Sequence, residues 1–222
     1  MGALSPKGKV ESAASAKCST GHRRSEAFKK NIVPALLTFQ KLFGKGKRLR
    51  YLCQDETRLG LKTETLKLIT AFGVKPVAPI LWKRENFWLY GVVEPLSGWH
   101  FCQEYAHLNG EDFQQFIDAL SLQLGEDIAL IQMDQAGAHV TNEIKWPENL
   151  IPVCQPAHSP ELNPIERVWE YIKQQLVGEV FTTLSQLRER LQQVLKKITP
   201  EQICSLSSYN FILEALFYAA SS

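Results

Sequence analysis

The run of residues 128–133 places the strongest constraint on the fold, because it is apolar except for Gln132. Strands of this kind are usually buried on both faces of an α/β sheet. A helix is predicted just before the run, from a cap at Asn109 to Leu124, because apolar residues recur there at helical spacing. The run stops at Asp134, and open α/β sheets place their sites at the carboxyl ends of strands. We therefore expect an α/β domain with Asp134 at a candidate site.

Antiparallel strands are predicted on the amino-terminal side of this run. Residues 87–93 and 99–105 flank a turn-like segment, which is typical of paired strands. Residues 49–56 alternate with the period of a strand, so Asp55 shares the apolar face at the strand's end and Glu56 points the other way. A carboxylate on a buried face needs a partner or a metal ion. The residues leave open whether Asp55 caps a turn or binds a metal.

A third carboxylate, Glu166, is expected in the first turn of a helix. Asn163 is a suitable N-cap for this helix and Pro164 suits its first position. The apolar stripe that should face the core consists of Ile165, Val168, Trp169, Ile172 and Leu176. Glu166 lies off the stripe, where it could bind a metal ion, but Asn163 and Glu166 also fit a capping box. Glu170, one turn later, is expected to face solvent.

The charge of the chain is unevenly distributed. Residues 1–50 contain 12 Lys or Arg and two acidic residues, so the net charge of +2 combines a basic start with an acidic remainder. A basic arm of this kind favours a polyanionic partner. Residues 1–25 are rich in Ser, Ala, Gly and Lys and lack apolar periodicity. We therefore expect residues 1–25 to be a disordered basic linker and residues 26–222 to form the folded domain.

The cysteine pattern and the hydropathy bear on the compartment. The five cysteines are widely separated and form no C-x-x-C pair, which argues against both a disulfide framework and a zinc site. No apolar run approaches the length of a membrane span. We expect a chain that works in a reducing cytoplasm, without a membrane partner.

Three motifs occur in a fixed order along the chain. They are Cys-Gln-Asp55-Glu-Thr-Arg-Leu-Gly, Met-Asp134-Gln-Ala-Gly-Ala-His139 and His158-Ser-Pro-Glu-Leu-Asn-Pro-Ile-Glu166-Arg-Val-Trp169. Together with the order of the predicted strands, they resemble bacterial insertion-sequence transposases of the mariner-related superfamily, over roughly residues 26–218. The resemblance implies a ribonuclease-H-like α/β domain: a mixed sheet, in which an antiparallel three-strand meander is followed by parallel strands, with helices on both faces.

The resemblance also implies a chemistry. In this family three carboxylates bind two Mg²⁺ ions, which Mn²⁺ can replace, and the residues that match are Asp55, Asp134 and Glu166. Their hard oxygen ligands suit such ions, which can activate a nucleophile and stabilise the leaving oxygen of a phosphodiester. The 32 positions between Asp134 and Glu166 are close to the family's usual spacing. His139 and His158 could contact DNA phosphate or lie near the site, but helix packing is an equally open role.

The partners implied are double-stranded DNA, both element ends and target, and a second copy of the chain in a homodimer. Work at the bacterial nucleoid follows from such partners. Family members carry helix-turn-helix domains upstream, and we expect this chain to lack them. A separately encoded helix-turn-helix partner is one expectation. Two alternatives remain: a related ribonuclease-H-like nuclease that cleaves without strand transfer, and an inactive remnant that only binds DNA.

Overall fold

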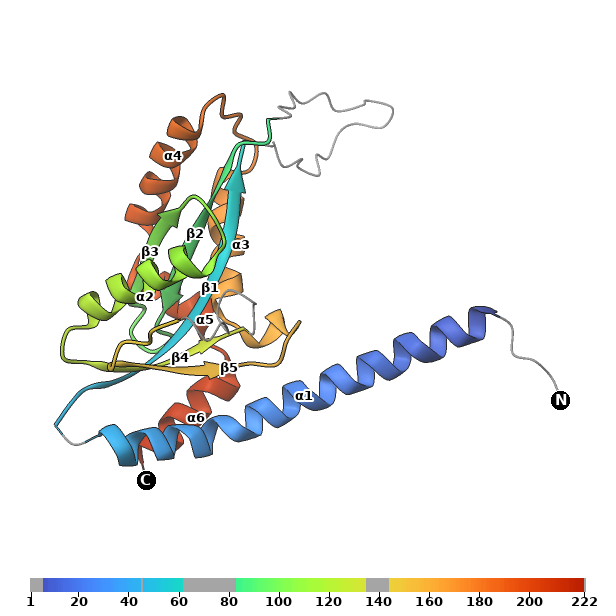
Figure 1. Ribbon diagram of the computed structural model, residues 1–222, viewed down its shortest axis with the longest axis vertical. Helices are drawn as coiled ribbons and strands as arrows, with labels where there is room; N and C mark the ends of the chain where they lie inside the picture. The colour runs from blue at the N-terminus through green and yellow to red at the C-terminus, as the bar shows by residue number, and fades with distance from the viewer. Residues whose placement is uncertain (1–5, 45, 62–82, 135–143, 222) are drawn as a thin grey trace.

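A computed structural model describes residues 6–44, 46–61, 83–134 and 144–221 of the chain, with the backbone alone for residues 6–22. Its centre is a five-stranded sheet in the order β3-β2-β1-β4-β5 (Figure 1). The strands are β1 (Leu49–Gly60), β2 (Asn86–Val93), β3 (His100–Tyr105), β4 (Ile128–Met133) and β5 (Leu150–Cys154). The pairs β1–β2 and β2–β3 are antiparallel, whereas β1–β4 and β4–β5 are parallel. The predicted meander followed by parallel strands is confirmed.

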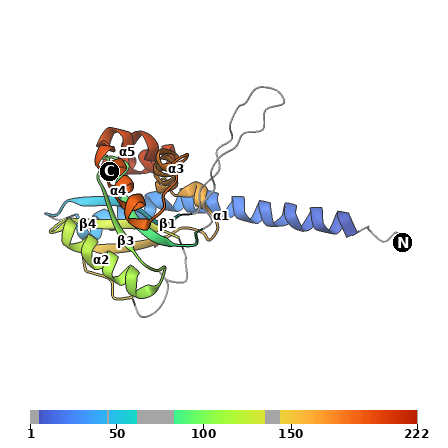
Figure 2. The same ribbon diagram turned by 90° about the horizontal axis from the view of Figure 1, so that it is seen from above.

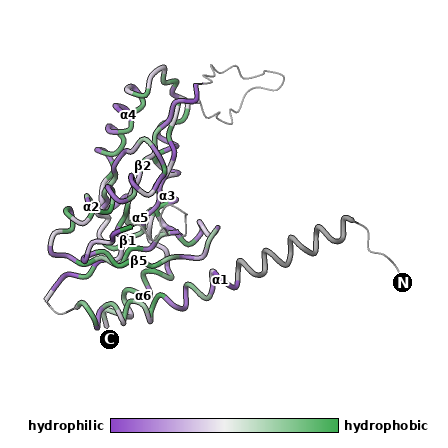
Figure 3. Tube along the Cα trace, in the orientation of Figure 1, coloured by the Kyte–Doolittle hydropathy of each residue, from purple (hydrophilic) through white to green (hydrophobic). Residues whose placement is uncertain are grey.

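Helices cover both faces of this sheet. The helices are α1 (Pro6–Phe43), α2 (Gly110–Leu124), α3 (Ile165–Leu176), α4 (Leu184–Lys197), α5 (Pro200–Ser207) and α6 (Asn210–Ala220), with a 3₁₀ turn, η1, at Pro160–Leu162. Figure 2 shows α2 on one face and α3, α4 and α5 on the other. Figure 3 shows hydrophobic stretches along the central strands and along α6, which lies beside the carboxy-terminal part of α1. The helical layers therefore bury both faces of the sheet.

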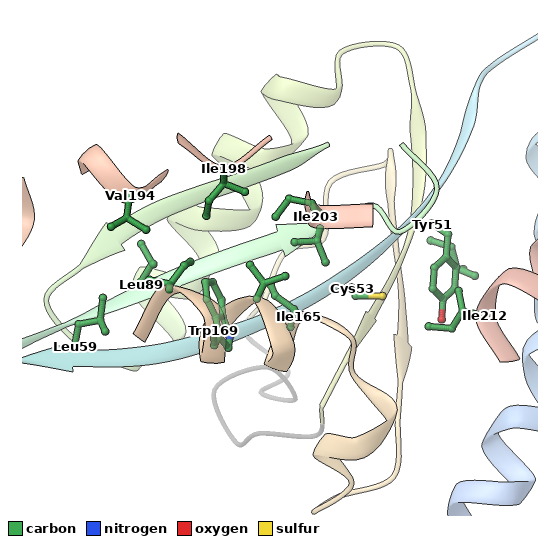
Figure 4. Close-up of a cluster of buried hydrophobic side chains, with 14 of the residues drawn as sticks. Tyr51, Cys53, Leu59, Leu89, Ile165, Trp169, Val194, Ile198, Ile203 and Ile212 are labelled. Carbon is green, nitrogen blue, oxygen red and sulfur yellow. The ribbon is translucent and has the colours of Figure 1, made fainter. Parts of the chain in front are cut away.

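Two clusters of buried side chains correspond to the two faces. Leu52, Ile131 and the inner face of α2 belong to one cluster. Tyr51, Cys53 and the inner face of α3 belong to the other (Figure 4). Neighbouring residues of β1 enter different clusters because successive side chains of a strand point to opposite faces. The run of β4 is buried at every position, as its sequence predicted. The central strands are thus fixed from both sides.

Helix α2 begins where the sequence predicts. The Asn109 side chain accepts a hydrogen bond from the backbone N–H of Asp112, so it caps the first turn. Five apolar side chains then form the buried face: Phe113, Phe116, Ile117, Leu120 and Leu124. Because α2 ends directly before β4, this packing places the end of β4 and hence Asp134.

Helix α1 begins at Pro6 and includes most of residues 1–25, and the expectation of a disordered linker there stays a prediction. Alanine and lysine favour helix, and a helix satisfies its backbone hydrogen bonds internally without burying an apolar face. Figure 1 shows the amino-terminal part of α1 extending away from the sheet. Position 26 therefore falls inside a continuous helix. The described residues contain no single helix long and apolar enough to cross a membrane, although the bent pair α5–α6 meets that test by length and composition.

Candidate active site

Asp55 lies in the middle of β1, opposite Gly91 of β2. The expectation that it ends the strand is wrong, because the antiparallel pairing with β2 continues as far as Gly60. The parallel pairing with β4 stops earlier, at Cys53 and Gln132. Asp55 therefore stands two residues beyond the last pair of β1 and β4.

Asp134 stands at the matching place on the neighbouring strand. It directly follows β4 and is also two residues beyond the pair of Cys53 and Gln132. Paired positions of neighbouring parallel strands lie side by side, so Asp55 and Asp134 reach the same level of the sheet. The face on which Asp55 stands is the one that α3 covers, since α3 packs with Tyr51 and Cys53. Register thus brings the first two predicted carboxylates to one place.

Glu166 approaches this place from the first turn of α3. Burial raises the pKa of Asp55 well above its usual range, and the negative charges of Glu56 and Glu166 raise it further. Burial also raises the pKa of Glu166; Lys173 opposes this, while Glu170 and then Asp134 add to it. A carboxylate disfavours ionisation of another only when the two are near. These interactions link Glu166 to Asp55 and to Asp134, although the three side chains do not form a group close enough to hold a metal ion.

Trp169 joins this group by a contact that the sequence did not predict. Its side chain is buried in the core, as expected, but its indole Nε1 also donates a hydrogen bond of 3.0 Å to Oδ2 of Asp55. Figure 4 shows the ring between α3 and the sheet. A buried indole N–H usually finds an acceptor. The sequence signal that could have predicted this contact was therefore a tryptophan one turn after Glu166.

A buried amide network holds the segment that leads into α3. Gln132 is fully buried and accepts a hydrogen bond of 2.5 Å from the Tyr51 hydroxyl. Its amide nitrogen donates to Oε1 of Gln155 at 2.7 Å and to the backbone oxygen of Leu162 at 2.8 Å. Gln155 in turn donates to the backbone oxygen of Ser159 at 3.3 Å. The one polar residue of the apolar run therefore ties β1, β4 and the residues after β5 to the loop before Glu166.

The capping box considered for Asn163 and Glu166 does not form. The backbone N–H of Asn163 donates to the Pro160 oxygen at 3.0 Å, and Oδ1 of Asn163 has no hydrogen-bond partner. Its Nδ2 donates instead to the backbone oxygen of Gln54 at 2.8 Å, which docks the loop beside Asp55. Helix α3 begins after Pro164, without a side-chain cap. The cap is replaced because a backbone acceptor on β1 satisfies the Asn163 amide.

The remaining candidates lie outside this constellation. Glu170 is exposed, as predicted. His158 is exposed and has a positive φ of 59°, and His139 lies outside the described residues. In the parts of the chain that the structure describes, no three His, Cys, Asp or Glu side chains are already close enough to hold a metal ion. Oxygen ligands from three mutually repelling carboxylates nevertheless have the chemistry that Mg²⁺ and Mn²⁺ prefer.

A cavity of about 370 Å³ lies elsewhere, between α1, α6 and β1. Its lining is mostly apolar, and the ion pair of Arg50 and Glu94 forms its polar part. Both side chains are nearly buried, with 2.8 Å between a guanidinium nitrogen and Oε2 of Glu94. The Arg50 guanidinium also stacks on the Trp99 ring, 4.1 Å from its centroid. Because none of the three carboxylates lines the cavity, we assign it no part in the site.

The mixed sheet order β3-β2-β1-β4-β5, with helices on both faces, is that of a ribonuclease-H-like α/β domain. A family model described as DDE superfamily endonuclease matches residues 50–188, a range that contains Asp55, Asp134 and Glu166. The chain belongs to this family.

Several known proteins are similar to this chain. The uncharacterized protein y4pE/y4sA of Sinorhizobium fredii (strain NBRC 101917 / NGR234) is 31% identical over 87 residues, which are 39% of this chain and 64% of that protein. The Mos1 strand transfer complex superposes with a TM-score of 0.62 at 17% identity, over 90% of this chain and 61% of that one. The isolated catalytic domain of Mos1 mariner transposase superposes with a TM-score of 0.54 at 15% identity, over 90% of this chain and 93% of that domain.

Further Mos1 structures with the same fold are paired-end complexes with Mn and with Mg. At such identities the likeness establishes the fold, so the ribonuclease-H-like prediction is confirmed. The chain spans 64% of the length of the curated relative and about 60% of the longer Mos1 chains.

Proposed function

We propose that this chain is the catalytic domain of an insertion-sequence transposase, which cleaves DNA phosphodiesters at element ends and joins them to a target. The observation that supports the proposal is that Asp55 and Asp134 stand at matching positions past the last β1–β4 pair, and that Glu166 interacts electrostatically with both. Membership of the DDE superfamily endonuclease family supports the cleavage step. The likeness to Mos1, whose structures include a strand transfer complex, supports the joining step.

In this proposal Asp55, Asp134 and Glu166 would be the ligands that hold two Mg²⁺ or Mn²⁺ ions. Such ions, when bound, lower the pKa of an attacking water and stabilise the leaving oxygen. The residues of the chain supply the position and the charge. Trp169 fixes one oxygen of Asp55, and the rigid first turn of α3 carries Glu166. The carboxylates disfavour one another's ionised forms, so a cation among them would relieve that repulsion.

We further propose double-stranded DNA as the partner, bound by a homodimer at the nucleoid in the bacterial cytoplasm. Exposed basic side chains lie close to the carboxylates along the chain: Arg58 follows Asp55 on β1, and Arg167 directly follows Glu166. The basic residues 1–50 add further positive charge. Lys and Arg that neutralise phosphates release counterions, so DNA binding should weaken steeply with salt. Recognition of element ends would fall to a helix-turn-helix partner.

The test uses the full chain with supercoiled plasmid carrying the element's flanking sequences, in Mg²⁺ or Mn²⁺. We expect nicked, linear and joined products from the wild type, and none from Asp55→Asn, Asp134→Asn or Glu166→Gln. Glu170→Gln is the matched control, because Glu170 sits one turn further along α3 and is exposed. Cleavage without joining would point to a related nuclease. Salt-sensitive binding with no metal-dependent cleavage would overturn the proposal in favour of an inactive remnant.

A further inference from the structure

We propose that Trp169 is a positioning residue of the metal site: its indole N–H holds Oδ2 of Asp55 and so orients the carboxylate that would bind a metal ion. The inference rests on the proposed function, because it assumes that Asp55 is a ligand. It adds a residue that the three-carboxylate pattern does not contain. The geometry of one hydrogen bond and of the packing around the ring carries it.

The hydrogen bond joins a single donor to a single acceptor group. An indole has one N–H and no acceptor, so it can only donate. Trp169 is 2% exposed, and its Nε1 lies 3.0 Å from Oδ2 of Asp55. Hydrogen bonds to an ionised acceptor are stronger than those between neutral groups. Together with a backbone hydrogen bond from Glu56, the indole contact therefore restrains rotation of the Asp55 carboxylate about its terminal torsion.

The ring itself has no room to move toward the sheet. A Cβ placed on Gly91 would lie 2.5 Å from Cη2 and 3.1 Å from Cζ2 of Trp169. Gly91 is also the cross-strand partner of Asp55. The missing side chain on β2 therefore lets the indole lie directly against the strand beside Asp55. Figure 4 shows the ring lying among the core side chains of this face, including Leu59, Leu89 and Ile165.

One turn of α3 consequently controls two of the three carboxylates. Glu166 and Trp169 are three residues apart, and such residues are neighbours on a helix surface. Glu166 is carried by the helix directly, and Asp55 is held through the indole. The position of α3 on the sheet, which the Gln132 network secures, thus sets the distance between the two ligands. Partners that orient a ligand typically change metal affinity by ~10- to 100-fold when they are removed.

The experiment measures Mn²⁺ affinity by calorimetry and by the paramagnetic resonance of free Mn²⁺, on the full chain with and without a nicked DNA duplex. Trp169→Phe removes the N–H and keeps an aromatic ring. Ile172→Ala is the matched control, because Ile172 is fully buried on the same helix and forms no hydrogen bond to Asp55 through its side chain. We expect Mn²⁺ to bind Trp169→Phe at least about tenfold more weakly and Ile172→Ala within about twofold of the wild type.

The outcomes separate this inference from the proposed function. Equal Mn²⁺ affinity of Trp169→Phe and wild type, or equal losses in Trp169→Phe and Ile172→Ala, would overturn the positioning role while metal binding itself stands. If the wild type binds no Mn²⁺, or Asp55→Asn binds it unchanged, the proposed metal site and this inference both fail. Should Trp169→Phe not fold, 3-benzothienylalanine at position 169 replaces the N–H by sulfur in a ring of the same shape. The same loss of affinity is expected.

Discussion

Gly91→Ala should destabilise the protein through the Trp169 ring. The added Cβ would lie 2.5 Å from Cη2, whereas ordinary contact requires 3.4–4 Å, so the ring must shift by about 1 Å. Overpacking of this kind costs about 1–3 kcal/mol. A shift of this size would also stretch the 3.0 Å bond to Asp55 beyond hydrogen-bonding distance, a loss of about 1.5–3 kcal/mol. We expect a fall in the free energy of unfolding of about 2.5–6 kcal/mol.

Urea denaturation of the metal-free protein, followed by circular dichroism, measures this loss, and Tm should fall by roughly 2–4 °C per kcal/mol. Trp169→Phe provides the decisive background, because phenylalanine lacks the ring atoms that the new Cβ would meet. In that background Gly91→Ala should cost at least about 1 kcal/mol less, a coupling expected only of residues in contact. The same cost in both backgrounds would refute the account of Gly91.

Three further predictions concern stability. Asp55→Asn should raise the Tm of the metal-free protein at pH 7. The pKa of the Asp55 carboxyl is raised in the folded state, so its contribution to stability is present below the unfolded pKa and is lost as pH rises. A difference in Tm between the variant and the wild type that does not narrow toward pH 4 would contradict this. Gln132→Leu leaves the partners of a buried amide unpaired and should cost about 2–4 kcal/mol in urea denaturation, whereas Gln123→Leu on the exposed side of α2 should be nearly neutral. Glu94→Ala leaves the buried Arg50 guanidinium poorly paired and should cost about 3–5 kcal/mol; recovery of most of that loss in Glu94→Ala with Arg50→Met would confirm that an uncompensated charge is the cause.

The parts of the fold that follow from local pattern could be predicted from the sequence. Every residue of β4 except Gln132 is apolar, and this pattern alone predicts burial on both faces of the sheet. Asn109 caps α2 with its own side chain. Asp134 could be placed at the end of β4 for the same reason. These predictions held because the deciding interactions lie within a few residues along the chain.

The parts that depend on distant partners could not be predicted in this way. Asn163 has the sequence of a cap, but a backbone oxygen on β1 satisfies its amide instead. Asp55 was expected at a strand end because its own alternation gives no sign of how far β2 pairs. The contact between Trp169 and Asp55 joins positions 114 residues apart and exists only once α3 has docked. Register and docking, rather than propensity, decided each of these cases.

The ladder between β1 and β4 ends at Cys53 and Gln132, while β1 continues with β2 alone as far as Gly60. The two central strands therefore separate after this pair, and Asp55 and Asp134 each stand two residues past the point of separation. Among the residues that the structure describes, no strand pairs with β1 on its β4 side past Cys53, and the Gln54 oxygen accepts a hydrogen bond from the Asn163 amide. A change in the spacing between Asp55 and Asp134 would therefore break no backbone hydrogen bond between β1 and β4.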